Sequence, residues 1–128
     1  SGLLAVTGTT NLIGNTSVAG TFAANGASLA VAKKFATTLQ ATLTITNGGT
    51  IAPTGTFQEI TAASPVTAVL RAPTNGELLI LLNSGANAIT IVDEAGTALA
   101  RNAVLGQNDT LMLIGATGSW YQIGGSNN

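Results

Sequence analysis

Five glycines recur at every sixth position near the start of the chain: Gly2, Gly8, Gly14, Gly20 and Gly26. A fixed short period is typical of repetitive β-structure, because each repeat adds one backbone rung and then bends in the same way. Glycine suits such a bend, since it adopts backbone conformations closed to other residues. The pattern therefore predicts an extended β segment, and the alternative is chance in a chain that contains 16 glycines.

Each six-residue repeat offers little to a hydrophobic core. One apolar or small residue lies two positions before each of the last four glycines, at Val6, Leu12, Val18 and Ala24. A single such side chain per repeat cannot enclose a core alone. We therefore predict that three copies of the segment intertwine. The candidates for the shared core are Val6, Leu12, Val18 and Phe22.

From Leu29 to Ile45 apolar and polar residues alternate, which is typical of a strand. Ser28 before an apolar run also fits the cap of a short helix, so both readings of residues 29–40 stay open. Weaker candidates for subunit packing are Leu29, Val31, Phe35 and, near the other end of the chain, Trp120. We predict that residues 1–46 are the extended trimerisation segment and that the glycines and Pro53 of residues 47–55 form a linker.

Residues 56–128 read as short strands separated by turns that are rich in glycine, asparagine and aspartate. The expected strands are Thr56–Thr61, Val66–Arg71, Glu77–Asn83, Ala88–Val92, Thr97–Ala100, Asp109–Ile114 and Ser119–Ile123. The run Leu78–Leu82 is apolar throughout and predicts a buried central strand. Short strands at even spacing favour a small antiparallel β-sandwich or barrel, so the expected fold class is all-β.

Only 7% of the residues are charged, where about a quarter is usual. Small neutral residues suit surfaces that other subunits cover, because interface centres are depleted of charge. A soluble monomer with a surface of threonine and asparagine is the alternative. The cations form no stripe and the net charge is -1, so we expect no nucleic-acid partner. No apolar run approaches the ~20 residues of a membrane span, so we expect no membrane partner either.

The sequence contains no residue set for catalysis, a metal or a cofactor, and we predict that the protein is not an enzyme. It has no histidine and no cysteine, which removes the common general base, thiol nucleophiles and the usual zinc ligands. Asp93 and Glu94 are adjacent and are expected to form a solvated hairpin turn. No glycine-rich segment matches a phosphate-binding loop or a dinucleotide fingerprint. Because the chain begins at Ser1, we expect that an initiator methionine or an upstream segment has been removed.

Three segments resemble phage and prophage virion proteins. Asp109-Thr-Leu-Met-Leu-Ile and Gly118-Ser-Trp-Tyr-Gln-Ile, followed by a short polar tail, are similar to the closing strands of such proteins. Leu81 to Asp93 looks like the strand, turn and strand that precede them. Val6-Thr-Gly-Thr-Thr-Asn-Leu-Ile-Gly-Asn is similar to repeats of trimeric phage fibres and spikes. Gln122 and Gly125 depart from the Glu and Arg that are common in the closing segment, and the repeat array is short for a fibre shaft.

The resemblance implies a viral structural protein with itself and the major capsid protein as partners. The expected function is a capsid decoration or cement protein that binds the outer surface of the phage head as a homotrimer and stabilises it. The alternative is a tail-fibre or tailspike module that binds host glycans with aromatic groups around Trp120 and Tyr121. A third reading, a carbohydrate-active enzyme, predicts two carboxylates about 5–10 Å apart in a cleft.

Overall fold

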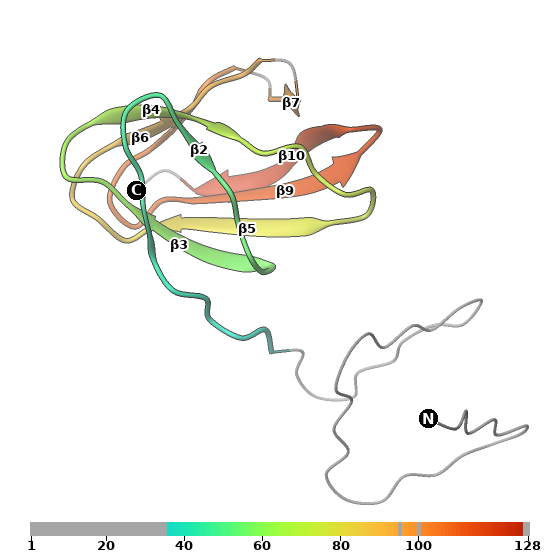
Figure 1. Cartoon of the computed structure of the whole chain (residues 1–128), viewed down its shortest axis with the longest axis horizontal. Coiled ribbons are helices and arrows are strands. Elements are labelled where there is room, and N and C mark those ends of the chain that lie inside the picture. The colour runs from blue at the N-terminus through green and yellow to red at the C-terminus, as the bar shows by residue number, and fades with distance from the viewer. Residues whose placement is uncertain (1–35, 95, 100, 127–128) are drawn as a thin grey trace, which may run out of the picture. The chain divides into compact units, whose positions relative to one another are not determined.

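The computed structural model describes residues 36–94, 96–99 and 101–126, and within these ranges the chain is all-β with no helix (Figure 1). Residues 36–40 belong to neither a strand nor a helix. The rest of the segment that the sequence left open as strand or helix lies outside the described residues. Outside them too are the repeat glycines and the trimer candidates Val6, Leu12, Val18, Phe22, Leu29, Val31 and Phe35.

The described strands form two sheets. The large sheet has six strands among the described residues, in the order β1 (Leu43–Thr44), β3 (Phe57–Thr61), β5 (Leu78–Asn83), β9 (Thr110–Ala116), β10 (Ser119–Ser126) and β7 (Thr97–Ala98). The small sheet has four, in the order β2 (Gly49–Ile51), β4 (Val66–Leu70), β6 (Ile89–Ile91) and β8 (Ala103–Leu105). Figure 1 shows β3, β5, β9 and β10 side by side.

The first six strands alternate between the two sheets, so the chain stacks like a β-solenoid. Strand β1 pairs in parallel with β3, and β3 with β5, while β2, β4 and β6 pair in parallel in the small sheet. The register sets Leu43 beside Ile60 and Phe57 beside Ile80, an advance of roughly 20 residues per turn, as in other stacked repeats. Each turn thus adds one strand to each sheet.

The last strands break this pattern. Strand β8 is antiparallel to β6, and β9 is antiparallel to both β5 and β10. The β9–β10 hairpin closes through Thr117 and Gly118, both with positive φ, as a two-residue hairpin turn needs. Strand β7 pairs in parallel with the start of β10.

The prediction of an antiparallel architecture was therefore wrong, because both sheets are mixed. Turn residues such as Asn83-Ser84-Gly85 send the chain from one sheet to the other instead of folding it back on its neighbour. Asp93 and Glu94 are exposed, as expected, but β6 and β7 on either side of them lie in different sheets and form no hairpin. Even spacing of short strands fits both architectures, since it reports strand length and not strand direction.

The predicted strands from Thr56 onward agree with β3, β4, β5, β6, β7, β9 and β10 to within a few residues at each end. The sequence missed β2 and β8, each of three residues, whereas β1 lies in the alternating stretch from Leu29 to Ile45 that favoured a strand. Strand β2 lies inside the predicted linker 47–55 and pairs with β4, so part of this segment belongs to the small sheet.

Buried side chains from both sheets form one core cluster. In the small sheet the register stacks Val66, Ile89 and Leu105 in one row and Ile51 beside Leu70. In the large sheet it stacks Leu79 beside Leu113 and Leu81 beside Leu111. All of these side chains are buried, which accounts for the branched aliphatic residues at alternate positions of each strand.

Candidate assembly surface

Strand β5 is apolar on both of its faces. Leu79 and Leu81 point into the core and are fully buried, whereas Leu78, Ile80 and Leu82 point to the other side of the sheet. Leu78 is 39% exposed. A strand with one solvated face normally alternates apolar and polar residues, and a continuous apolar run is typical of a strand covered on both sides. In the described structure only one side of β5 is covered.

The neighbouring strands extend this uncovered surface across the large sheet. Leu78 lies beside Ile114, which lies beside Tyr121, and Ile80 lies between Phe57 and Met112. Tyr121 is 40% exposed and Met112 37% exposed. We call this set of side chains the outer apolar face. It consists of Phe57, Leu78, Ile80, Leu82, Met112, Ile114 and Tyr121.

The outer apolar face carries almost no charge. On β3, β5, β9 and β10 the only charged residue is Glu59, whose Oε2 accepts a hydrogen bond of 3.0 Å from Thr42 Oγ1. Leu78, Met112, Ile114 and Tyr121 are each 37–40% exposed, and the other three side chains are half-buried. A contiguous neutral surface of this kind is suited to contact with another protein surface.

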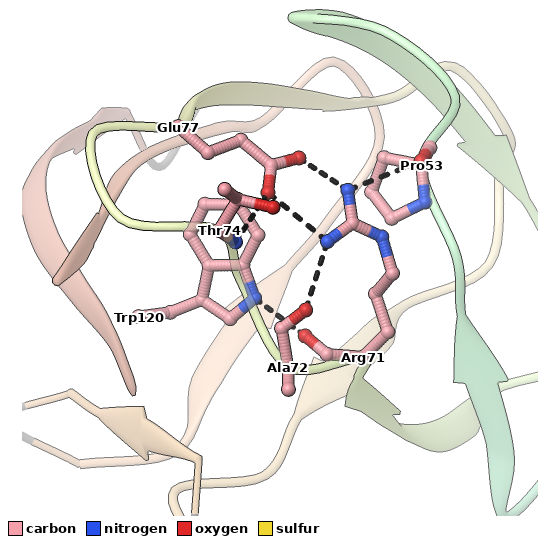
Figure 2. A network of polar contacts seen from close by, with 6 residues as sticks. All are labelled: Pro53, Arg71, Ala72, Thr74, Glu77 and Trp120. Atoms are coloured by element: carbon pink, nitrogen blue, oxygen red, sulfur yellow. Dashed lines mark hydrogen bonds and ion pairs between the residues drawn. The ribbon is translucent and has the colours of Figure 1, made fainter. Parts of the chain in front are cut away.

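A polar network closes one end of the core (Figure 2). Both terminal nitrogens of Arg71 donate to the carboxylate of Glu77, and one also donates to the carbonyl of Ala72 at 2.8 Å. The backbone N–H of Thr74 donates to Glu77 Oε2 at 2.9 Å. Trp120 Nε1 donates to the carbonyl of Arg71 at 2.7 Å, and the guanidinium lies 5.9 Å from the centre of the indole ring.

The network shifts the pKa values of its two charged members in opposite directions. Hydrogen bonds from Arg71 hold the pKa of Glu77 below its ordinary value, against the opposing effect of partial burial, and the bond from Thr74 lowers it further. The bond to Glu77 raises the pKa of Arg71. Both groups therefore stay charged at neutral pH with their main bonding positions filled within the chain. This arrangement holds the loop 71–77 in place and offers no free acid or base.

Trp120 packs in the core of its own chain. Its side chain is fully buried among the core residues of its own chain, and its single donor is used by Arg71. The ring is therefore available neither to a second subunit nor to a sugar. Its neighbour Tyr121 points to the opposite side of β10 and is the exposed aromatic residue of the pair.

Most of the carboxylates have partners within the chain. Besides Glu59 and Glu77, Asp93 Oδ1 accepts from the N–H of Leu99 at 3.0 Å and Asp109 Oδ2 accepts from that of Gly106 at 2.7 Å. Asp109 is fully buried. Within the described ranges no group of three or more metal-ligating side chains is found. The hydrogen bonds of Asp93 and Asp109 therefore stabilise turns and loops.

Comparison of the sequence with models of protein families and with curated proteins gives no match. In the part of the chain that the structure describes, no helix has the length and apolarity to cross a membrane.

The sequence expectations did not include the outer apolar face. Leu78–Leu82 was expected to be buried, and the structure places it between β3 and β9 with one covered face. A signal was nevertheless present, because the run is apolar at odd and even positions alike. Met112, Ile114 and Tyr121 join Leu78 and Ile80 only through the strand register, which the sequence did not reveal.

Proposed function

We propose that this chain is a non-enzymatic structural subunit that works as a homotrimer and that the outer apolar face is where the copies pack together. The observation that carries the proposal is the central strand β5, apolar on both sides with only one side covered. The centre of an interface is its most apolar part and is depleted of charge, so a contiguous neutral apolar face of this kind suits the centre of one.

The molecule we propose is a small β-sandwich preceded by intertwined N-terminal repeats, and the assembly it serves is the outer shell of a phage head. The resemblance to virion proteins and the very low charge support this setting. As a decoration protein the trimer would contact several copies of the major capsid protein at once. Three linked contacts gain avidity without strong individual binding, and they would resist separation of the capsid subunits.

The oligomeric state tests the proposed packing. Sedimentation of the full chain should give a trimer, and Ile114→Glu should give a monomer with an unchanged far-ultraviolet circular dichroism spectrum, because burying an unpaired carboxylate in the contact between copies is costly. Thr50→Glu, at an exposed position of β2 in the other sheet, is the matched control and should remain trimeric. A monomeric parent chain, or a trimeric Ile114→Glu variant, would contradict the proposal.

Location in the particle tests the proposed setting. In a reconstruction of virions that carry this chain, density for it should lie on the outside of the head shell at positions of threefold contact. Density confined to the tail would instead favour a fibre or spike module.

A further inference from the structure

A hollow of about 800 Å³ lies between the edge of the small sheet and the end of the large one. We call it the edge hollow. Its walls are Arg101, Asn102, Ala103, Val104, Leu105, Thr110, Leu111, Gln122, Gly125 and Ser126. One wall is thus all of β8 with the two residues before it, and the other comes from β9 and the second half of β10. Leu105 and Leu111 at its base are buried.

The strand order explains why the hollow exists. The two sheets grow in step through β1 and β2, β3 and β4, and β5 and β6, and β8 then follows β6 in the small sheet as β9 follows β5 in the large one. The large sheet continues to β10, whereas the small sheet ends at β8 among the described residues. The edge hollow therefore occupies the position of a further strand of the small sheet, opposite residues 122–126.

The edge of β8 is chemically open to such a strand. It is paired to β6 on one side and to no described strand on the other. Natural proteins usually protect a free edge by keeping the strand short, as β8 is, or with proline, charge or a covering segment. The sequence Ala103-Val104-Leu105 has neither proline nor charge, and the Val104 side chain is 53% exposed. An extended segment here would gain backbone hydrogen bonds, as in other cases of strand addition.

We propose that an extended part of residues 1–35 from a second copy of this chain adds to β8 in the edge hollow. The small residues Ala103, Gly125 and Ser126 in its walls let the backbone of an extended segment approach closely. Residues 1–32 contain no charge and no proline and are rich in glycine, alanine, threonine and serine. Because the stretch has no proline, no residue in it lacks the backbone N–H that a ladder needs. A stretch of about five residues, at roughly 3.3 Å each, would span the hollow.

We assign the segment to a second copy because the proposed function makes this chain a homotrimer. The described chain enters the large sheet at β1, and β3, β5 and β9 lie between β1 and β10. At about 4.8 Å per strand, the entry edge is roughly 19 Å from the edge that forms the hollow. Complementary features on opposite edges of one subunit produce a head-to-tail contact, which closes into a ring when three copies meet. The inference rests on the proposed homotrimer, and it supplies the head-to-tail contact that would close three copies into a ring.

Photo-crosslinking of the full chain tests this inference. A benzophenone amino acid is placed at Val104, and isotopically labelled and unlabelled copies are unfolded together and refolded. We expect crosslinked peptides that join position 104 to residues 1–35 with mixed isotopes, which only two copies can produce. The same group at exposed Thr50, on the opposite edge of the small sheet, is the control. Its yield of the mixed-isotope product should be at least tenfold lower than that at Val104.

The other outcomes overturn the inference. Products that join position 104 to residues 1–35 with unmixed isotopes only would show the chain's own residues in the hollow, and products within residues 36–126, or none, would show that no N-terminal strand binds there. Sedimentation of the same samples separates the two proposals. A trimer that gives no mixed-isotope product would be consistent with the proposed homotrimer and would contradict only the addition of an N-terminal strand to β8.

Discussion

At the scale of single residues, buried polar groups organise the turns of this protein. Asn83 is fully buried at the end of β5. Its Nδ2 donates to the carbonyls of Asn87 and Leu105, both at 2.9 Å, and its Oδ1 accepts from the N–H of Gly85 at 3.1 Å. One side chain thus joins the crossing between the sheets to the end of β8. Gln58 is equally buried, but its Oε1 has no hydrogen-bond partner in the described structure.

Asn83→Ala should lower the free energy of unfolding by about 2–4 kcal/mol, because it leaves three backbone groups without their partner in a buried place. Urea denaturation followed by circular dichroism measures the change. Asn75→Ala, in an exposed turn, is the control and should stay within about 0.5 kcal/mol of the parent. A loss below about 1 kcal/mol for Asn83→Ala would mean that the three bonds are easily replaced by water.

Glu77→Gln tests the ion pair through its pH dependence. The pKa of Glu77 is lowered in the folded chain, so its contribution is complete above the unfolded value of 4.5 and is lost as the pH falls through the lower folded value. Arg71 and Glu77 are 33% and 22% exposed, and solvent screening limits the contribution to about 1 kcal/mol. The parent should exceed the variant by this amount at neutral pH.

The same comparison in acid completes the test. At a pH below the folded pKa the parent carboxyl is neutral and the two proteins should converge in urea midpoint, because glutamine keeps the acceptor for the Thr74 N–H. A difference that persists unchanged in acid would assign the effect to packing and not to charge.

At the scale of elements, the loop 71–77 and the β9–β10 hairpin require each other. Trp120 on β10 reaches the carbonyl of Arg71, and the N–H of Gly76 donates to the carbonyl of Gly115 at 2.8 Å. Gly115 on β9 has no room for a side chain, since an added Cβ would lie 2.5 Å from both Pro73 Cβ and the Thr74 carbonyl oxygen. The loop therefore rests directly on the backbone of the strand.

Gly115→Ala should destabilise the fold by roughly 1–3 kcal/mol, because the rigid loop must move away from the new methyl group. Thermal unfolding measures the loss. Gly124→Ala on β10 is the matched control, since its added Cβ would meet only Met112 Cβ at the ordinary distance of 3.9 Å. Equal melting temperatures for the two variants would show that the contact at Gly115 is not tight in solution.

Most strands could be predicted from local sequence, whereas their partners could not. Alternating apolar residues and turn residues located β3 to β7, β9 and β10, because side-chain alternation is a local property of an extended chain. Strand β8 was missed because Ala103-Val104-Leu105 is too short to show a period. Parallel pairing joins residues such as Gly49 and Ala68 that are distant in the chain, and no local pattern encodes it.

At the scale of the whole molecule, the outer apolar face and the low charge lead to the same expectation about association. The chain has nine charged residues, four cationic and five anionic, and only Glu59 lies on the strands that form the face. Association through such a surface is driven by removal of apolar area from water. Ion pairs contribute little to this association, so sodium chloride should change the association constant only slightly.

The trimer should remain associated when the ionic strength is raised. Between about 0.05 and about 0.5 M sodium chloride the association constant should change less than about threefold, because screening acts on charges that the face does not carry. Ammonium sulfate should strengthen association, since it favours apolar burial. Sedimentation equilibrium measures both effects, and dissociation in sodium chloride would point to a charged interface elsewhere.

The glycine period, the apolar strand Leu78–Leu82 and the absence of histidine and cysteine were enough to predict an all-β chain and to propose an assembly role. These are properties of local backbone preference and composition, which any sequence displays directly. The tertiary structure alone decided that Trp120 is a core residue, that Tyr121 and Ile114 share a face with Leu78, and that β8 ends the small sheet beside a hollow. Each of these depends on strand register and order, which arise from contacts between distant residues.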